Sequence, residues 1–268
     1  MSGAGEDAAP RTVALFASCA ADLAAPGPAL AALRVLAAAG LRVEVPEAQT
    51  CCGQVGLNSG HREPAKRLMR RWIEVFEPYD AVVGVSGSCV ATVFHQFARV
   101  LDGEWRGRAE RVAARTWEFT RFVHDRADGL DLELDTCVTW HDSCHMLRSL
   151  GEKSAPRQVL GRVRGLTLAE AADNEVCCGF GGTFALKYPE LSCAMADGKL
   201  DDFAATRSGG RTPEQVVSAD ATCLLHLSLR AQARGLPLRT VHIAELLAAA
   251  LPGGPRSLPA DARDGAAT

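Results

Sequence analysis

The sequence reads Thr50-Cys51-Cys52-Gly53-Gln54 in its first half and Val176-Cys177-Cys178-Gly179-Phe180 in its second, so a Cys-Cys-Gly motif occurs twice. One cysteine precedes each pair by 31 or 32 intervening residues, and another follows it by 36 or 44. The eight repeated cysteines are Cys19, Cys51, Cys52, Cys89, Cys144, Cys177, Cys178 and Cys223. A repeat held in this register predicts two copies of one structural unit.

Short apolar runs alternate with helical patterns along the whole chain. The runs that predict strands are 12–16, 41–45, 81–85, 137–140, 216–218 and 238–243. Residues 29–39 are rich in Ala and Leu, and the apolar positions of 68–76 have the three- and four-residue spacing of one helix face. Strands that alternate with helices favour parallel sheets, whose ligands lie where strands end. We therefore expect an α/β protein with two pseudo-repeated lobes, whose parallel-type sheets face a common cleft.

The repeat also suggests how the chain is divided. Aromatic and charged residues in the central segment predict packed helices, and the Gly-, Pro- and Ala-rich ends predict disorder. The expected parts are a disordered N-terminus 1–10, a first cysteine-rich repeat 11–101, a helical connector 102–135, a second cysteine-rich repeat 136–251 and a disordered tail 252–268.

Composition narrows the environment and the partners. Because 29 basic side chains face 32 acidic ones, no strong field favours nucleic acid or an anionic membrane. No apolar run reaches the roughly 18 residues that span a bilayer, and the start lacks the order of a signal peptide. We expect a cytoplasmic protein without a transmembrane segment. In that reducing compartment the ten cysteines favour metal binding or redox chemistry over disulfides.

Each repeat supplies four thiolates, the donor number that an iron–sulfur cluster or a zinc ion needs. A glycine-flanked turn lets two adjacent cysteines point at one metal group from different directions. The predicted metal ligands are Cys19, Cys51, Cys52 and Cys89 in the first repeat, and Cys144, Cys177, Cys178 and Cys223 in the second. His226 follows Cys223 by three residues and is a further candidate to bind the cofactor, whereas Thr92 holds the corresponding place in the first repeat. We expect the first site to hold iron–sulfur, zinc or nothing.

Other residues have more ordinary explanations. Cys137 and Cys193 have no counterpart in the other half and are expected to fill space in the core. His141, Asp142 and His145 surround Cys144, where they could activate a thiolate or tune a cluster through hydrogen bonds. The glycine clusters contain no clean G-x-G-x-x-G between strand and helix, so they indicate room for a cluster rather than a dinucleotide site.

The stretches 46–54, 86–89, 141–145 and 177–184 together resemble the cysteine-rich CCG domain family. That family includes a subunit of heterodisulfide reductase, the iron–sulfur subunit of glycolate oxidase and lactate-utilisation protein A. The short chain without a ferredoxin-like module is most similar to the last. The resemblance implies an iron–sulfur electron-transfer subunit that works with an iron–sulfur partner subunit and a third subunit. The complex would oxidise L-lactate to pyruvate, and this chain would not itself bind the substrate.

The chain departs from the family pattern at the end of each repeat. The pattern ends in C-x-x-C, whereas this sequence has Cys89-Val-Ala-Thr92 and Cys223-Leu-Leu-His226. We therefore expect an ordinary or histidine-assisted 4Fe-4S cluster at the second repeat. Two alternatives stay open, a zinc-stabilised interaction module and a thiol-based redox enzyme.

Overall fold

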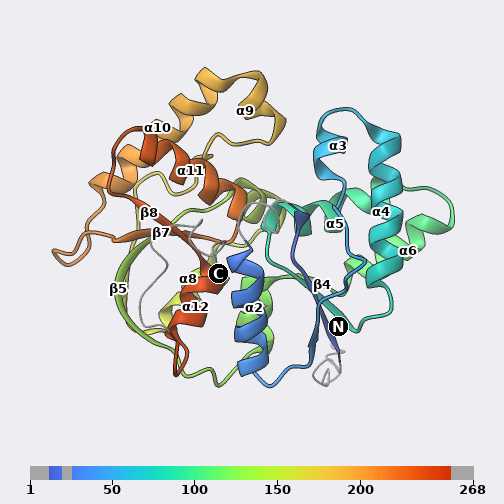
Figure 1. Ribbon diagram of the computed structural model, residues 1–268, viewed down its shortest axis with the longest axis horizontal. Helices are drawn as coiled ribbons and strands as arrows, with labels where there is room; N and C mark the ends of the chain where they lie inside the picture. The colour runs from blue at the N-terminus through green and yellow to red at the C-terminus, as the bar shows by residue number, and fades with distance from the viewer. Residues whose placement is uncertain (1–11, 20–25, 255–268) are drawn as a thin grey trace, which may run out of the picture.

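The structure, a computed structural model, describes residues 12–19 and 26–254 of the chain. The disorder expected for residues 1–10, and for the tail beyond residue 254, lies outside the described residues. Two four-stranded sheets, each parallel throughout, form two lobes (Figure 1). The strands are β1 (Val13–Phe16), β2 (Val43–Glu44), β3 (Ala81–Gly84), β4 (Thr116–Glu118), β5 (Glu133–Trp140), β6 (Arg164–Ala169), β7 (Gln215–Ser218) and β8 (Arg239–His242).

The strand order shows that the sequence repeat is also a repeat of topology. The first sheet runs β2-β1-β3-β4 and the second runs β6-β5-β7-β8, which is the same order in the second copy. In each sheet the second strand of the repeat lies on one side of the first strand, and the third and fourth strands lie on its other side. The predicted pair of α/β lobes with parallel sheets is confirmed.

All six predicted strands form, and two further strands were missed. The short strand β4 lies within 102–135, where only packed helices were expected, and its three residues are too few to show an alternating pattern. The other, β6, is an edge strand that begins with Arg164 and Gly165, and glycine is uncommon in strands.

Helices cover both faces of the sheets. They are α2 (Gly27–Ala38), α3 (Gln54–Asn58), α4 (Arg62–Phe76), α5 (Gly87–Val100), α6 (Glu104–Ala113), α7 (Phe119–Arg126), the π-helical turn η1 (His145–Ser149), α8 (Ser154–Gly161), α9 (Thr183–Lys187), α10 (Pro189–Ala205), α11 (Ala221–Ala233) and α12 (Ile243–Ala250). As its spacing predicted, α4 buries one face, where Trp72 meets the ring of Phe16 edge-on at 5.4 Å. No helix among the described residues is both long enough and apolar enough to cross a membrane.

One hydrophobic cluster extends across both lobes, and each lobe has a further cluster of its own. Val13 of β1, Val138 of β5 and Val217 of β7 belong to the same buried cluster. Helices of the two lobes also pack on each other: α12 packs on α2 (Figure 1), and α7 packs on α8. The ring of His242 makes a 2.9 Å hydrogen bond to the carbonyl of Val85 across this junction. The lobes are therefore held in a definite orientation, and the ends of their strands meet.

Candidate metal centre

All eight repeated cysteines line a single cavity of about 180 Å³ between the lobes. Each of them follows a strand: the single cysteines come after β1, β3, β5 and β7, and the pairs come after β2 and β6. In parallel sheets ligands bind beyond the carboxyl ends of strands, where the chain reverses its strand order. The common cleft that the sequence predicted is therefore built by the cysteines of both repeats. Cys137 and Cys193 do not line it.

Within each repeat the thiols form a chain of contacts, which we call a half-site. In the first half-site Cys19 and Cys52 both hydrogen-bond to Cys51, and Cys52 also meets Cys89. The second half-site repeats the pattern with Cys144, Cys177, Cys178 and Cys223. Hydrogen bonds from the neighbouring thiols lower the pKa of Cys51 and of Cys177, in each case mostly through the first cysteine of the repeat. Each half-site is thus centred on the first cysteine of its Cys-Cys pair.

The Cys-Cys-Gly turn has the same geometry in both copies. The amide of Gly53 donates to the sulfur of Cys51 over 3.3 Å, and that of Gly179 donates to Cys177 over 3.4 Å. Both glycines have positive φ, +83° and +90°. A Cβ on Gly179 would lie 2.6 Å from the carbonyl oxygen of Ser192, so the turn packs directly against α10. Only glycine fits this conformation and this contact.

The last cysteine of each half-site sits in the first turn of a helix. Cys89 lies in α5 and Cys223 in α11. Ser86 caps α5, whereas Asp220 caps α11 and also accepts a 3.0 Å bond from the amide of Ser88 in the other lobe. Asp220 is buried and lines the cavity. Sequence reasoning missed this residue, although an Asp directly before a helical pattern is a capping signal.

The predicted histidines occupy different places. His145 lines the cavity, with its Nδ1 3.6 Å from the sulfur of Cys144 and its Nε2 3.2 Å from the side-chain nitrogen of Gln54 in the first lobe. His226 is not among the described residues that line the cavity. Its Nε2 lies 3.2 Å from the hydroxyl of Ser192, and that hydroxyl donates to the carbonyl of Gly179 over 2.8 Å. His226 therefore supports the Cys-Cys-Gly turn from behind, and its role as a ligand stays a prediction.

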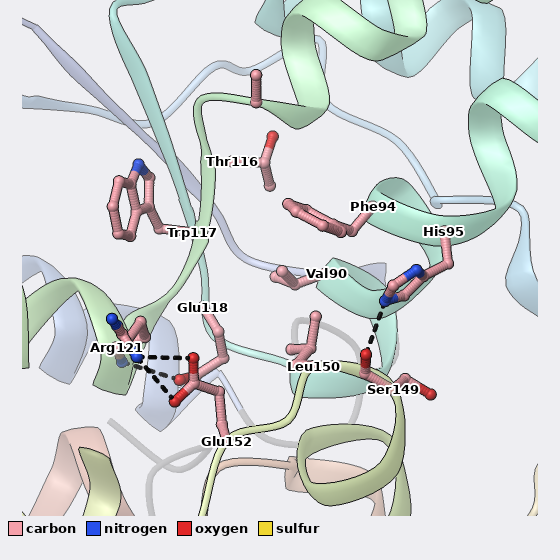
Figure 2. A pocket seen from close by; sticks show the side chains of 11 residues that line it. Val90, Phe94, His95, Thr116, Trp117, Glu118, Arg121, Ser149, Leu150 and Glu152 are labelled. Carbon is pink, nitrogen blue, oxygen red and sulfur yellow. Dashed lines mark hydrogen bonds and ion pairs between the residues drawn. The ribbon is translucent and has the colours of Figure 1, made fainter. Parts of the chain in front are cut away.

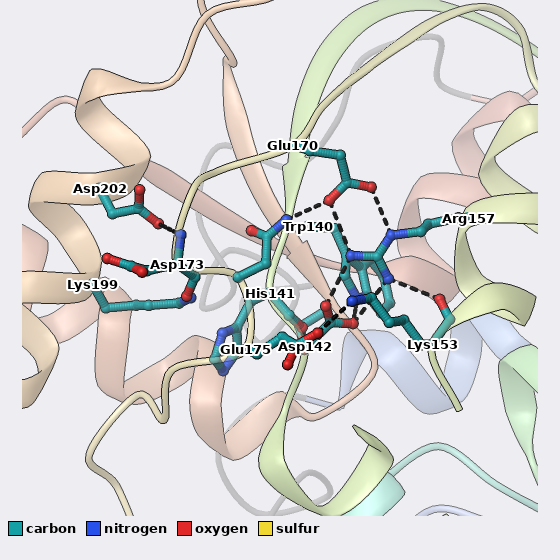
Figure 3. A network of polar contacts seen from close by, with 12 residues as sticks. Trp140, His141, Asp142, Lys153, Arg157, Glu170, Asp173, Glu175, Lys199 and Asp202 are labelled. Atoms are coloured by element: carbon teal, nitrogen blue, oxygen red, sulfur yellow. Dashed lines mark hydrogen bonds and ion pairs between the residues drawn. The ribbon is translucent and has the colours of Figure 1, made fainter. Parts of the chain in front are cut away.

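Asp142 is tied up in a structural network rather than paired with Cys144. Its carboxylate accepts two bonds from Arg157, at 3.0 and 2.8 Å, and one from the indole of Trp140 at 2.7 Å. Arg157 also donates two hydrogen bonds to Glu170, so it bridges two carboxylates (Figure 3). Asp142 anchors the segment that carries Cys144.

Beside this network, His141 is fully buried near the second half-site. Its ring lies with the sulfurs of Cys178 and Cys223 in a group whose donor atoms are all within 4.8 Å of one another. Burial, with a smaller effect from Lys199, lowers the pKa of His141 to about 4, so the ring is neutral at pH 7. Lys199 is itself buried, and its ammonium donates to the carbonyl of Asp173. The sequence already placed this histidine near the site, because His141 precedes Cys144 by only three residues.

Two other cavities are lined by residues of the first lobe and of the π-helical turn η1. A larger one of about 420 Å³ contains no cysteine; it is lined by Glu118, whose pKa burial raises to about 7, and by the Arg121–Glu152 ion pair (Figure 2). A second, of about 270 Å³, shares Gln54, Asn58 and His145 with the cysteine cavity. Arg99 and Arg148 line this second cavity, and no Asp or Glu among the described residues does. We call it the cationic pocket.

The donor set fits a thiolate-bound metal group. Thiolates and imidazole are soft to intermediate ligands that suit iron–sulfur clusters and zinc. The eight sulfurs converge from two repeats, and none of the ten cysteines, all of which are described, forms a disulfide. Gly181 and Gly182 also line the cavity, which agrees with the prediction that the glycine cluster leaves room there.

Comparison with known proteins gives consistent matches. A family profile, CCG, described as a cysteine-rich domain, matches residues 13–94 and 138–228. Proteins named Lactate utilization protein A from Bacillus cytotoxicus and from Bacillus cereus strain G9842 are each 41% identical over 88% of this chain and 98% of their own length. A solved ABC transporter solute-binding protein from Conexibacter woesei covers 87% of this chain and 70% of its own at 17% identity, but its TM-score of 0.25 supports no argument. This chain belongs to the CCG cysteine-rich domain family and carries two copies of the domain.

Proposed function

We propose that this chain is an iron–sulfur electron-transfer component of a multi-subunit oxidoreductase that takes part in lactate utilisation. The observation that carries the proposal is the convergence of all eight repeated cysteines on one cavity. Packing alone does not require eight thiols at the facing ends of two sheets. Thiols gathered in this way, without disulfides, are typical of a metal centre.

The second half-site is our candidate for a 4Fe-4S cluster, held by Cys144, Cys177, Cys178 and Cys223. The first half-site would hold an iron–sulfur group, a zinc ion or nothing. When bound, an iron–sulfur cluster supplies one-electron transfer at a potential set by its charge, its hydrogen bonds and its burial.

The chain's own residues set the surroundings of that chemistry. Cys52 and Cys178 are buried, so they exclude water from the inner wall of the cavity. The amides of Gly53 and Gly179 donate to cysteine sulfur, which stabilises the thiolate. The buried carboxylate of Asp220 has the opposite effect, because a nearby negative charge disfavours further negative charge in the cavity.

The remaining parts of the proposal concern partners and substrate. Cys19 is the exposed member of the eight, so the first half-site offers the route to the surface. The cationic pocket beside it would favour an acidic docking partner. The relatives' name, Lactate utilization protein A, is consistent with a system of several components. We propose an iron–sulfur partner subunit and a third subunit, with oxidation of L-lactate to pyruvate by the complex in the cytoplasm.

The test is anaerobic purification of the protein with iron and sulfide analysis and an EPR spectrum of the reduced sample. Four proteins are compared: wild type, Cys178→Ser, Cys52→Ser and the control Cys193→Ser, whose cysteine lies outside the cavity. We expect a reducible signal that Cys178→Ser removes and Cys193→Ser leaves intact, while Cys52→Ser reports whether the first half-site is loaded. Zinc without iron would reject electron transfer and favour an interaction module.

A further inference from the structure

His141 is a buried histidine that hydrogen bonding within the protein does not explain. Its side chain is fully buried, and neither Nδ1 nor Nε2 has a hydrogen-bond partner among the described residues. An unsatisfied buried polar group costs about 1–3 kcal/mol. A buried ring without an internal partner indicates that something outside the polypeptide completes this site, and a metal group would take one of its two nitrogens.

The backbone holds this ring in place. The amide of His141 donates to the carbonyl of Val217 over 2.8 Å, and the hydroxyl of Ser218 donates to its carbonyl over 3.0 Å. Both bonds tie the end of β5 to β7. The ring stands edge-on to Phe203 at 6.2 Å and 81°. These bonds fix the backbone of His141, and the ring packed on Phe203 lies beside Cys178 and Cys223.

The first repeat provides an internal comparison. His141 precedes Cys144 by three residues, as Phe16 precedes Cys19. Phe16 is equally buried, and it packs edge-on against Trp72 and Phe76 at 5.4 and 5.5 Å. The fold thus accepts an apolar ring at this place. A polar ring here is a feature of the second half-site alone.

We propose that His141 is a nitrogen ligand of the metal group in the second half-site, where it binds a metal ion together with Cys178 and Cys223, or replaces one of the four cysteines as the protein ligand of a cluster iron. This deepens the proposed function and assigns the histidine that assists the second site to the residue directly after β5 rather than to α11. Imidazole and thiolate together are a common donor set for such metals. Donors 2.0–2.3 Å from one tetrahedral metal are about 3.5–3.8 Å apart. A group already within 4.8 Å needs to close by about 1 Å.

The experiment loads the metal-free protein with Zn²⁺ alone and measures X-ray absorption at the zinc edge. A nitrogen shell at about 2.0–2.1 Å is resolved from sulfur at about 2.3 Å. We expect this shell in wild type and in the control His226→Gln, and its loss in His141→Phe, which copies the first repeat. A His145→Gln protein should keep it, which separates His141 from the histidine that lines the cavity.

Two results would overturn the proposal: a wild-type spectrum with sulfur ligands only, or a nitrogen shell that persists in folded His141→Phe. The first needs no variant, so the test survives even if His141→Phe does not fold. The zinc spectrum reports only which atoms bind the metal. It can therefore show no nitrogen ligand while the iron analysis finds a cluster, or show a nitrogen ligand while the iron analysis finds none. Failure of His141 as a ligand is thus distinguishable from failure of the iron–sulfur proposal.

Discussion

Replacing Gly179 with alanine tests whether the Cys-Cys-Gly turn is required by shape as well as by backbone conformation. An L-residue at positive φ costs about 1–2 kcal/mol. A Cβ here would also lie 2.6 Å from the oxygen of Ser192 and 2.9 Å from the Cβ of Met195, both on α10. Overpacking of this kind costs about 1–3 kcal/mol more. We expect Gly179→Ala to lower the free energy of unfolding by about 2–5 kcal/mol.

The matched control is Gly60→Ala. Gly60 has φ +83°, close to the +90° of Gly179, but a Cβ there would meet nothing within 4 Å. The free energy of unfolding of this variant should fall only by the conformational cost, about 1–2 kcal/mol. Urea unfolding of both metal-free proteins, followed by circular dichroism, measures the difference. Equal losses in the two variants would refute the argument that α10 shapes the turn.

Three further results are expected. Asp220→Ala should lose about 1–3 kcal/mol of stability, because it removes a helix cap and the link to Ser88. The control Ser86→Ala should lose less, because its 3.5 Å cap bond stays within one lobe. Similar melting temperatures for the two variants would contradict this. Burial lowers the pKa of His242 to about 4, below the unfolded value of 6.5. The neutral ring therefore contributes fully to folding stability above pH 6.5, and this contribution is lost as the pH falls to 4. The stability gap between wild type and His242→Gln should narrow by about 3 kcal/mol over that window, and a constant gap would count against the buried neutral ring. Replacing Arg99 and Arg148 by Ala should slow reduction of the loaded protein by its partner at low salt and leave the EPR spectrum of the protein unchanged. If added salt does not weaken the difference in reduction rate, docking at the cationic pocket is contradicted.

The chain alone was enough to predict the repeat and most of the fold. Adjacent cysteines followed by glycine recur in register, and the six apolar runs that were expected as strands all form. These are local properties, because side-chain pattern and turn chemistry act within a few residues. Strand β4 escaped prediction for the same reason: three residues carry too little pattern.

The sequence also identified the eight cysteines as one class of residue, but it described them as two sets of four. That they line one cavity depends on how the lobes dock, through α12 on α2 and through a core that both sheets share. Such packing joins residues that are far apart in the chain, so no local pattern reports it.

The histidines show most clearly the difference between what local sequence predicts and what packing determines. Spacing favoured His226, three residues after Cys223, yet its Nε2 lies beside Ser192 behind the turn. The structure instead places His141, at the end of β5, beside Cys178 and Cys223. Sequence spacing determined which residue types were available and which strand ends they follow. Only the tertiary packing decided which rings reach the sulfurs, because side-chain direction depends on how strands and helices lie against one another.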